Sequence, residues 1–224
     1  MNIIDPVING TIRGIFRIFY RFDPSPLTQV PKEGPLIITA NHTHFLDAPL
    51  LYVFMQPRTL VAMAKKQLWD HAVTRFIMHR WKTIPVDRDS MGRETMNACF
   101  NVLKRQEILA IAPEGTRSRS GVLQEGKSGV AYIAYREKAP IIPIVTLGFE
   151  DRKSYRWPLR RTPLHIAVGT PYEIIDTGSR LSAQGREELM QEIMMRIATL
   201  LPEDKRGIYR DREVEFVHTR DITL

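Results

Sequence analysis

The sequence predicts an α/β fold in which a mostly parallel sheet is flanked by helices. Short apolar runs alternate along the chain with longer stretches of helical periodicity, an alternation typical of parallel sheets covered by helices. The hydrophobic content of 43% and the length of 224 residues suit one sizeable core. We therefore expect a single central domain with a shorter segment at each end.

Residues 3–22 are predicted to form an amphipathic helix. Its expected apolar face consists of Ile4, Ile8, Ile12, Ile15, Phe16 and Phe19. Arg13, Arg17 and Arg21 are expected to form a basic stripe on the opposite side. Such a helix can lie in a membrane interface with its arginines among lipid phosphates, and the alternative is a helix docked on its own domain. We favour a membrane-interface helix over residues 1–23, ended by the proline-rich stretch that follows.

The central domain is expected to span residues 24–202. Its predicted strands are Leu36–Ala40, Thr59–Ala64, Lys82–Val86, Ile108–Ala112, Ile141–Val145 and Leu164–Val168. Its predicted helices are Ala48–Met55, Lys66–His79, Ser90–Gln106, Lys127–Lys138 and Ser182–Leu200. Ser182 is the expected N-cap of the last helix, and Pro202 ends it. The charged tail, residues 203–224, is expected to pack loosely.

The charge balance points to an anionic partner. The net charge is +7, from 32 basic and 25 acidic residues. One basic cluster, Arg152 to Arg161, also holds Tyr155 and Trp157, a combination suited to an anionic membrane surface. A solvated surface would explain such a cluster equally well. We expect no nucleic-acid partner, because no recognised RNA- or DNA-binding motif is present.

The sequence also bears on the compartment. The single cysteine, Cys99, excludes an intramolecular disulfide and fits a reducing compartment. Cys99 lies in a helical pattern, where a buried thiol is expected rather than a nucleophile. We find no signal-peptide pattern and no run of about eighteen apolar residues. The expectation is a cytoplasmic protein associated peripherally with the membrane, of undetermined oligomeric state.

The stretch "ITANHTHFLDAP" holds His42, His44 and Asp47 directly after a predicted strand. Three interpretations are open: a metal site, a general base with its orienting carboxylate, or a polar turn without chemistry. A catalytic metal needs a third protein ligand, and the remaining histidines do not stand in metal-spacing motifs. We therefore expect no metal.

His42 and Asp47 alone form the pattern H-x-x-x-x-D at a strand-to-helix turn. In this setting the aspartate can fold back to the imidazole, fix its tautomer and support the imidazolium. No protein nucleophile accompanies the pair. The pattern therefore favours a base that activates a hydroxyl of the substrate itself.

Four blocks in order make the chain resemble the glycerolipid acyltransferase family, of the 1-acyl-sn-glycerol-3-phosphate acyltransferase type. They are "NHTHFLD" (41–47), "IPVDRDS" (84–90), "IAPEGTRS" (111–118) and "APIIPIVTLG" (139–148). Two departures are visible. His44 stands where the family usually has serine or threonine, and Ala112 stands where an aromatic residue is common.

The resemblance implies the glycerolipid acyltransferase fold and His42 and Asp47 as catalytic residues. It implies that the substrate-binding residues are Arg88, Glu114, Gly115, Thr116 and Arg117. It further implies a lysophospholipid acceptor, 1-acyl-glycerol-3-phosphate above others, and acyl-CoA or acyl-carrier protein as donor substrate, without a cofactor. Another lyso-lipid, glycerol-3-phosphate, or a non-catalytic lipid-binding role on the same fold are the alternatives.

The physical chemistry of the third block agrees with this resemblance. "PEGTR" follows a predicted strand, at the edge where such sheets bind ligands. Gly115 lets the backbone approach a ligand closely, and Arg117 can clamp a phosphate with two hydrogen bonds. Glu114 is expected to hold glycerol hydroxyls or to orient Arg117. Lys127, near a predicted helix start, is a further candidate cation.

Overall fold

The computed structural model describes residues 4–87, 91–150, 161–176, 178 and 181–224. Within these residues, eight strands form one sheet, in the order β10-β9-β6-β2-β5-β3-β4 with β8 paired to β6. The central pairs β6–β2, β2–β5, β5–β3 and β3–β4 are parallel. Strands β8, β9 and β10 add an antiparallel extension beyond β6. The predicted α/β class with a mostly parallel core is confirmed.

The elements are bounded as follows. The strands are β1 (Tyr20–Arg21), β2 (Leu36–Ala40), β3 (Leu60–Lys65), β4 (Ile84–Val86), β5 (Ile108–Ile111), β6 (Ile141–Leu147), β7 (Thr162–Pro163), β8 (His165–Val168), β9 (Tyr172–Ile174) and β10 (Thr219–Asp221). The α-helices are α1 (Ile4–Phe19), α2 (Asp47–Phe54), α3 (Ala72–Arg80), α4 (Arg93–Lys104), α5 (Gly129–Glu137) and α6 (Ala183–Ala198). The 3-10 helices of the described residues are η1 (Ser25–Gln29), η2 (Lys66–Trp69), η4 (Glu203–Lys205) and η5 (Gly207–Tyr209).

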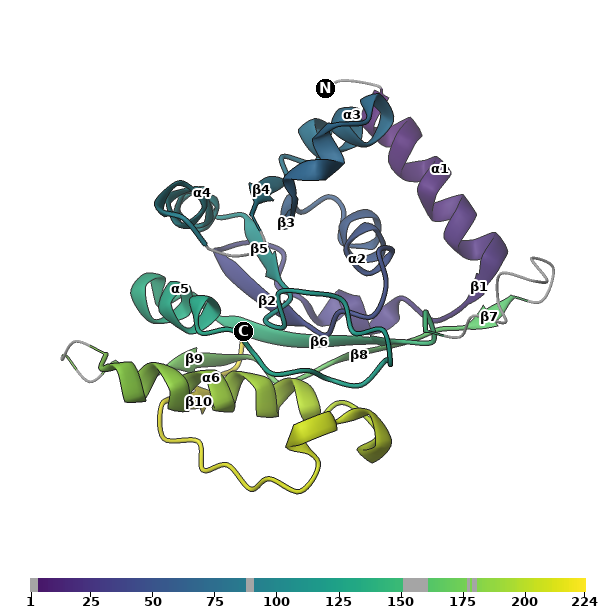
Figure 1. Ribbon diagram of the computed structural model, residues 1–224. Coiled ribbons are helices and arrows are strands. Elements are labelled where there is room, and N and C mark those ends of the chain that lie inside the picture. Colours follow the sequence, from purple (N-terminus) through teal and green to yellow (C-terminus); the bar gives the residue numbers. More distant parts are fainter. Residues whose placement is uncertain (1–3, 88–90, 151–160, 177, 179–180) are drawn as a thin grey trace.

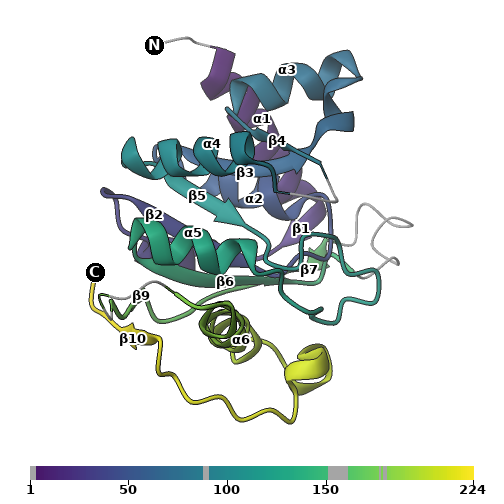
Figure 2. The same cartoon turned by 60° about the vertical axis from the view of Figure 1, so that its left-hand side comes forward.

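Helices cover both faces of the sheet, as Figures 1 and 2 show. Because successive strand residues point to opposite faces, Ile37 and Leu109 join a core cluster with α4, α5 and α6. Their neighbours Ile38 and Ala110 join a second cluster with α1 and α2. The central strands β2, β5 and β6 are mostly apolar because both of their faces are buried.

The six predicted strands are all present, with ends within two residues of those expected. The predicted helix over Lys66–His79 is wrong as one element. It divides into η2 and α3, because His71 has an extended backbone that starts α3 anew. Ser182 caps α6 as predicted, since its hydroxyl accepts a hydrogen bond from Gly185 N at 2.9 Å.

Helix α1 differs from its prediction in the faces it presents. Phe16 is buried against the domain, whereas Ile15 and Phe19, predicted on the same face, are exposed. Arg13 does not belong to an outer basic stripe, because its Nε donates to the carbonyl of Val53 on α2. Among the helices of the described residues, none is long and apolar enough to cross a membrane.

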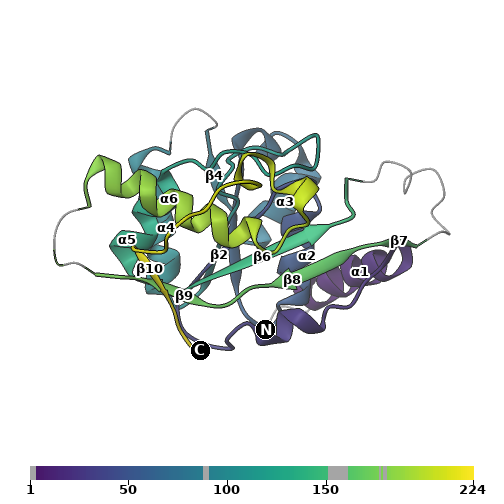
Figure 3. The same cartoon turned by 90° about the horizontal axis from the view of Figure 1, so that it is seen from below.

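The expectation of a loosely packed tail is wrong. Strand β10 pairs with β9, and Figure 3 shows the C-terminal segment returning beside α6 to reach it. Glu192 of α6 is buried and accepts hydrogen bonds from Val217 N, His218 N and the Thr219 hydroxyl. A buried carboxylate needs such partners, and the tail provides them. The division at residues 23 and 202 stays a prediction.

Candidate active site

The predicted site residues other than Arg88 meet at the carboxyl ends of two neighbouring strands. Strands β2 and β5 are parallel and in register, with Thr39 opposite Ile111. The segments that follow them, residues 41–47 and 113–117, therefore leave the sheet side by side. A hydrogen bond of 2.7 Å from Ser118 N to His42 O joins the two segments.

Asp47 organises the hydrogen bonds of the turn between β2 and α2. It is buried at the start of α2, and its Oδ2 accepts hydrogen bonds from His42 Nδ1 at 2.9 Å, Thr43 N at 2.9 Å and His44 N at 2.8 Å. Its Oδ1 accepts one from the Thr146 hydroxyl at 3.0 Å. Four donors thus satisfy both oxygens of this buried carboxylate.

This arrangement fixes the chemistry of His42. An ionised carboxylate only accepts hydrogen bonds, so the Nδ1 of His42 carries the proton and Nε2 is left with its lone pair. The His42 side chain is 27% exposed, whereas that of Asp47 is 6% exposed. The geometry is that of a base open to solvent on one side and oriented by a buried carboxylate on the other.

Asn41 and Thr146 were not among the predicted site residues. The Asn41 side chain exchanges two hydrogen bonds of 2.9 Å with the backbone of Thr146 on β6, and the Thr146 hydroxyl reaches Asp47. The pair thus ties the turn that carries His42 and Asp47 to the neighbouring strand β6. The one signal in the sequence is a threonine near the end of the apolar run "IIPIVTLG".

Glu114 lies beneath the loop rather than on its surface. It is buried, its Oε1 accepts a hydrogen bond from His42 N at 2.8 Å, and its Oε2 accepts from Gln124 N at 3.0 Å and Gln124 Nε2 at 3.2 Å. Burial raises the pKa of the Glu114 carboxyl, and these hydrogen bonds oppose the rise. Both oxygens are used within the protein, so the geometry favours a positioning role, and the expected contact with substrate stays a prediction.

Gly115, Thr116 and Arg117 form the exposed part of the same loop. Gly115 has a φ of +66°, a conformation that L side chains rarely adopt. Within the described part of the chain, Arg117 forms no ion pair. Its guanidinium is therefore available to an anionic ligand. Arg88 and the basic cluster over residues 152–160 lie outside the described residues.

His44 is a partly buried residue of the turn that carries His42 and Asp47. Its Nδ1 accepts a hydrogen bond from Leu46 N at 3.3 Å, and its ring stacks on Phe149 with centroids 5.4 Å apart. Burial lowers the pKa of the His44 imidazole, as do Arg117 and His42, while Asp47 opposes the shift. His44 is thus favoured in its neutral form, with Nδ1 as an acceptor.

The metal and cysteine chemistries concern other side chains. Among the described residues, no group of three or more His, Cys, Asp or Glu side chains is placed to hold a metal ion. Cys99 is buried, and burial raises the pKa of its thiol to about 12. The thiol therefore stays protonated at neutral pH, unlike a reactive cysteine.

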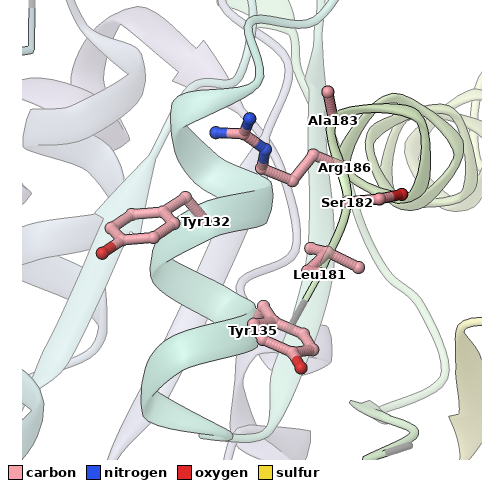
Figure 4. A pocket seen from close by; sticks show the side chains of 6 residues that line it. All are labelled: Tyr132, Tyr135, Leu181, Ser182, Ala183 and Arg186. Carbon is pink, nitrogen blue, oxygen red and sulfur yellow. The ribbon is translucent and has the colours of Figure 1, made fainter. Parts of the chain in front are cut away.

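A cavity of about 310 Å³ lies away from these residues, between α5 and the start of α6. Figure 4 shows its lining of Tyr132, Tyr135, Leu181, Ser182, Ala183 and Arg186. It contains none of the predicted site residues.

Comparison with known proteins places this site in context. The family model described as Acyltransferase matches residues 23–147, more than half of the chain. A 1-acyl-sn-glycerol-3-phosphate acyltransferase of Bacillus subtilis (strain 168) is 26% identical over 171 residues, which cover 76% of this chain and 83% of that protein. The protein of the same name from Streptococcus pneumoniae is 25% identical over 179 residues, covering 79% of this chain and 65% of that protein.

A solved structure shares the fold. The crystal structure of the 1-acyl-sn-glycerophosphate (LPA) acyltransferase PlsC from Thermotoga maritima aligns with a TM-score of 0.57 and 19% identity. The alignment covers 81% of this chain and 76% of that one. The similarity extends well beyond the residues of the site.

Proposed function

Because the chain belongs to the Acyltransferase family, we propose that it transfers a fatty acyl group from a thioester donor to the hydroxyl of a lysophospholipid. The observation that carries this proposal is the His42–Asp47 pair, 2.9 Å apart, beside a loop with an exposed arginine. The proposed acceptor is 1-acyl-glycerol-3-phosphate, since two relatives bear the name of that activity. The proposed donor is acyl-CoA or acyl-carrier protein, and the product is phosphatidic acid.

The proposed mechanism uses the free nitrogen of His42. Nε2 takes the proton of the acceptor hydroxyl while the hydroxyl oxygen attacks the thioester carbonyl. Asp47 stabilises the imidazolium, and the Thr146 hydroxyl and two backbone N–H groups hold Asp47 in place. The tetrahedral intermediate collapses, the C–S bond breaks, and the imidazolium returns its proton to the leaving thiolate. No acyl-enzyme forms.

The acceptor phosphate is proposed to bind at the loop of residues 115–117. The exposed Arg117 guanidinium can donate two parallel hydrogen bonds to phosphate oxygens. Thr116 adds a hydroxyl donor, and the absence of a side chain at Gly115 allows close approach. Arg88 stays a predicted second cation, and Glu114 supports the loop from below through His42 N and Gln124.

The reaction as proposed requires no cofactor. The acyl group is already activated as a thioester, and the base and its orienting carboxylate come from the chain itself. Activity is therefore expected to survive treatment with a chelator.

We propose that the protein acts at the cytoplasmic surface of an anionic membrane. Val7, Ile15 and Ile18 form an exposed apolar stripe on α1, opposite the face that packs on the domain. Val7 is 60% exposed and Ile18 is 61% exposed, which is unusual for large apolar side chains gathered on one helix face. The exposed Arg17 on the same helix suits lipid phosphates.

The experiment that tests the proposal measures thiol release by the purified full-length protein. Acyl-CoA is supplied with 1-acyl-glycerol-3-phosphate, glycerol-3-phosphate or a lysophosphatidylcholine, with and without EDTA. We expect chelator-insensitive thiol release with 1-acyl-glycerol-3-phosphate, matched by phosphatidic acid formation. Binding of the lipid without thiol release, from either acyl-CoA or acyl-carrier protein, would contradict the enzyme proposal and favour a lipid-binding protein.

A further inference from the structure

The segment of residues 123–127 returns from the site loop to α5 along a tightly held path. Leu123 N donates to Lys205 O at 2.8 Å, and Gln124 donates twice to the buried Glu114 carboxylate. Lys127 N donates to Pro113 O at 2.9 Å. The backbone of Lys127 is therefore fixed directly beside the loop that carries Gly115 and Arg117.

The side chain of Lys127 lies across Gly115. A Cβ atom added to Gly115 would come within 2.9 Å of Lys127 Cδ, 3.0 Å of Cε and 3.2 Å of Nζ. Glycine at this position thus leaves room for the lysine stem as well as permitting the positive φ. The Lys127 ammonium consequently lies against Gly115, which precedes Arg117 by two residues in the chain.

The Lys127 ammonium has no acidic partner within the residues that the structure describes. The nearby Glu114 is buried with both oxygens engaged. The stem and ammonium of Lys127 lie against the backbone of Gly115. An arginine on the exposed loop and a lysine beside it together match the charge of a phosphate monoester.

We propose that Lys127 binds the phosphate of the acceptor together with Arg117 and thereby selects phosphate-bearing acceptors. The inference rests on the proposed function, because it specifies the acceptor contact of the same site. In this arrangement Arg117 supplies the planar, two-point contact and Lys127 supplies a mobile point charge.

The C-terminal segment holds Lys127 in this place. The buried Tyr209 hydroxyl accepts a hydrogen bond from Gly126 N at 3.3 Å. Gly126 is packed so closely on α6 that an added Cβ would lie 2.6 Å from Met194 Cγ. Gly207 has a φ of +58°, and a Cβ there would lie 2.1 Å from Leu123 O. Tyr209 is accordingly a positioning residue for the phosphate contact.

The test compares Lys127→Gln with Lys104→Gln, an exposed lysine on α4. We expect Lys127→Gln to raise the KM for 1-acyl-glycerol-3-phosphate by about tenfold or more, since one charge-assisted hydrogen bond is lost. The kcat and the melting temperature are expected to stay near the wild-type values. Tyr209→Phe is expected to raise the same KM by a smaller factor, and Lys104→Gln to leave it unchanged.

A binding measurement separates this inference from the proposed function. Calorimetry with a short-chain 1-acyl-glycerol-3-phosphate is expected to show weaker binding by Lys127→Gln than by the wild type and Lys104→Gln. If the wild type turns over the acceptor while Lys127→Gln keeps its KM and affinity within twofold, the role of Lys127 is refuted. If the wild type shows Lys127-dependent binding without turnover, the role of Lys127 stands and the proposed function fails.

Discussion

Asp47 illustrates how single residues organise this site. A carboxylate buried at the first turn of a helix is costly unless its oxygens find donors. Here two backbone N–H groups, an imidazole and a hydroxyl provide them. The aspartate thus both shapes the turn and orients His42, which explains why the two residues must be spaced as they are.

His44 gives a pH-dependent prediction. Its pKa in the folded protein lies below the ordinary value of 6.5, mainly because of burial. As the pH falls through about 6.5, the unfolded chain binds this proton before the folded one does, so the free energy of unfolding decreases. Above that range the imidazole is neutral in both states, and no such loss occurs.

The measurement is urea unfolding between about pH 8 and pH 5 for the wild type and His44→Asn, whose amide does not titrate in this range. We expect the wild type to lose more stability on acidification than the variant. The groups that face His44 are Asp47, His42 and Arg117, and all three are retained in the variant. Parallel stability curves for the two proteins would refute the assignment.

For single residues, the sequence predicted contacts within the local turn better than contacts with residues distant in the chain. The spacing of His42 and Asp47 predicted their contact, because it lies within one local turn. The hydrogen bond from Thr146 could not be predicted in this way, since that residue is brought close by the pairing of β2 with β6. The inward position of Glu114 likewise depends on residues 123–127, which fold back after the loop.

Helix α1 shows how an element can use two apolar faces. Phe16 packs near Phe149, which in turn stacks on His44. The inner face of α1 is therefore linked through Phe149 to the turn that carries His42 and Asp47. The outer face carries Val7, Ile15 and Ile18. Helical periodicity predicted an amphipathic helix. Because apolar residues occur on both sides of it, the periodicity did not identify the face that is buried.

The outer face of α1 yields a prediction for membrane binding. We expect Ile15→Ser with Ile18→Ser to lower the vesicle partition coefficient at least tenfold, because burying each large apolar side chain is worth about 1.5 kcal/mol or more. Flotation with vesicles containing anionic lipid measures the partition. Deleting the whole helix would be a poor test, because it would remove Phe16 from the core.

The matched control changes two exposed apolar residues elsewhere, Ile208→Ser with Val217→Ser. This variant is expected to float like the wild type. Equal flotation of all three proteins would rule out the outer face of α1 as the docking surface.

Across the sheets, the parallel strands β2 to β6 were predictable, whereas the short strands β1, β7, β9 and β10 were not. The central strands are continuous apolar runs buried on both faces, so each can be recognised from its own residues. Strands β1, β7, β9 and β10 have two or three residues each, and they exist only through distant partners. The charged tail was predicted to pack loosely because the residue that binds it, the buried Glu192, belongs to an earlier helix, α6. The sequence of the tail alone does not reveal this contact.

The residues, the elements and the sheet together build one site. The sheet brings two loops together, the helices and the tail hold those loops, and one imidazole nitrogen is left open to solvent. We propose that His42 is the general base of an acyl transfer.

The most direct test measures kcat for acyl transfer from acyl-CoA to 1-acyl-glycerol-3-phosphate by His42→Ala and the wild type. We expect a loss of about 10²–10⁴-fold, the usual contribution of a positioned base, with a cooperative unfolding transition retained. Asp47 keeps three of its four hydrogen-bond donors in this variant, so the turn should survive. A folded His42→Ala protein with a kcat near that of the wild type would contradict the account.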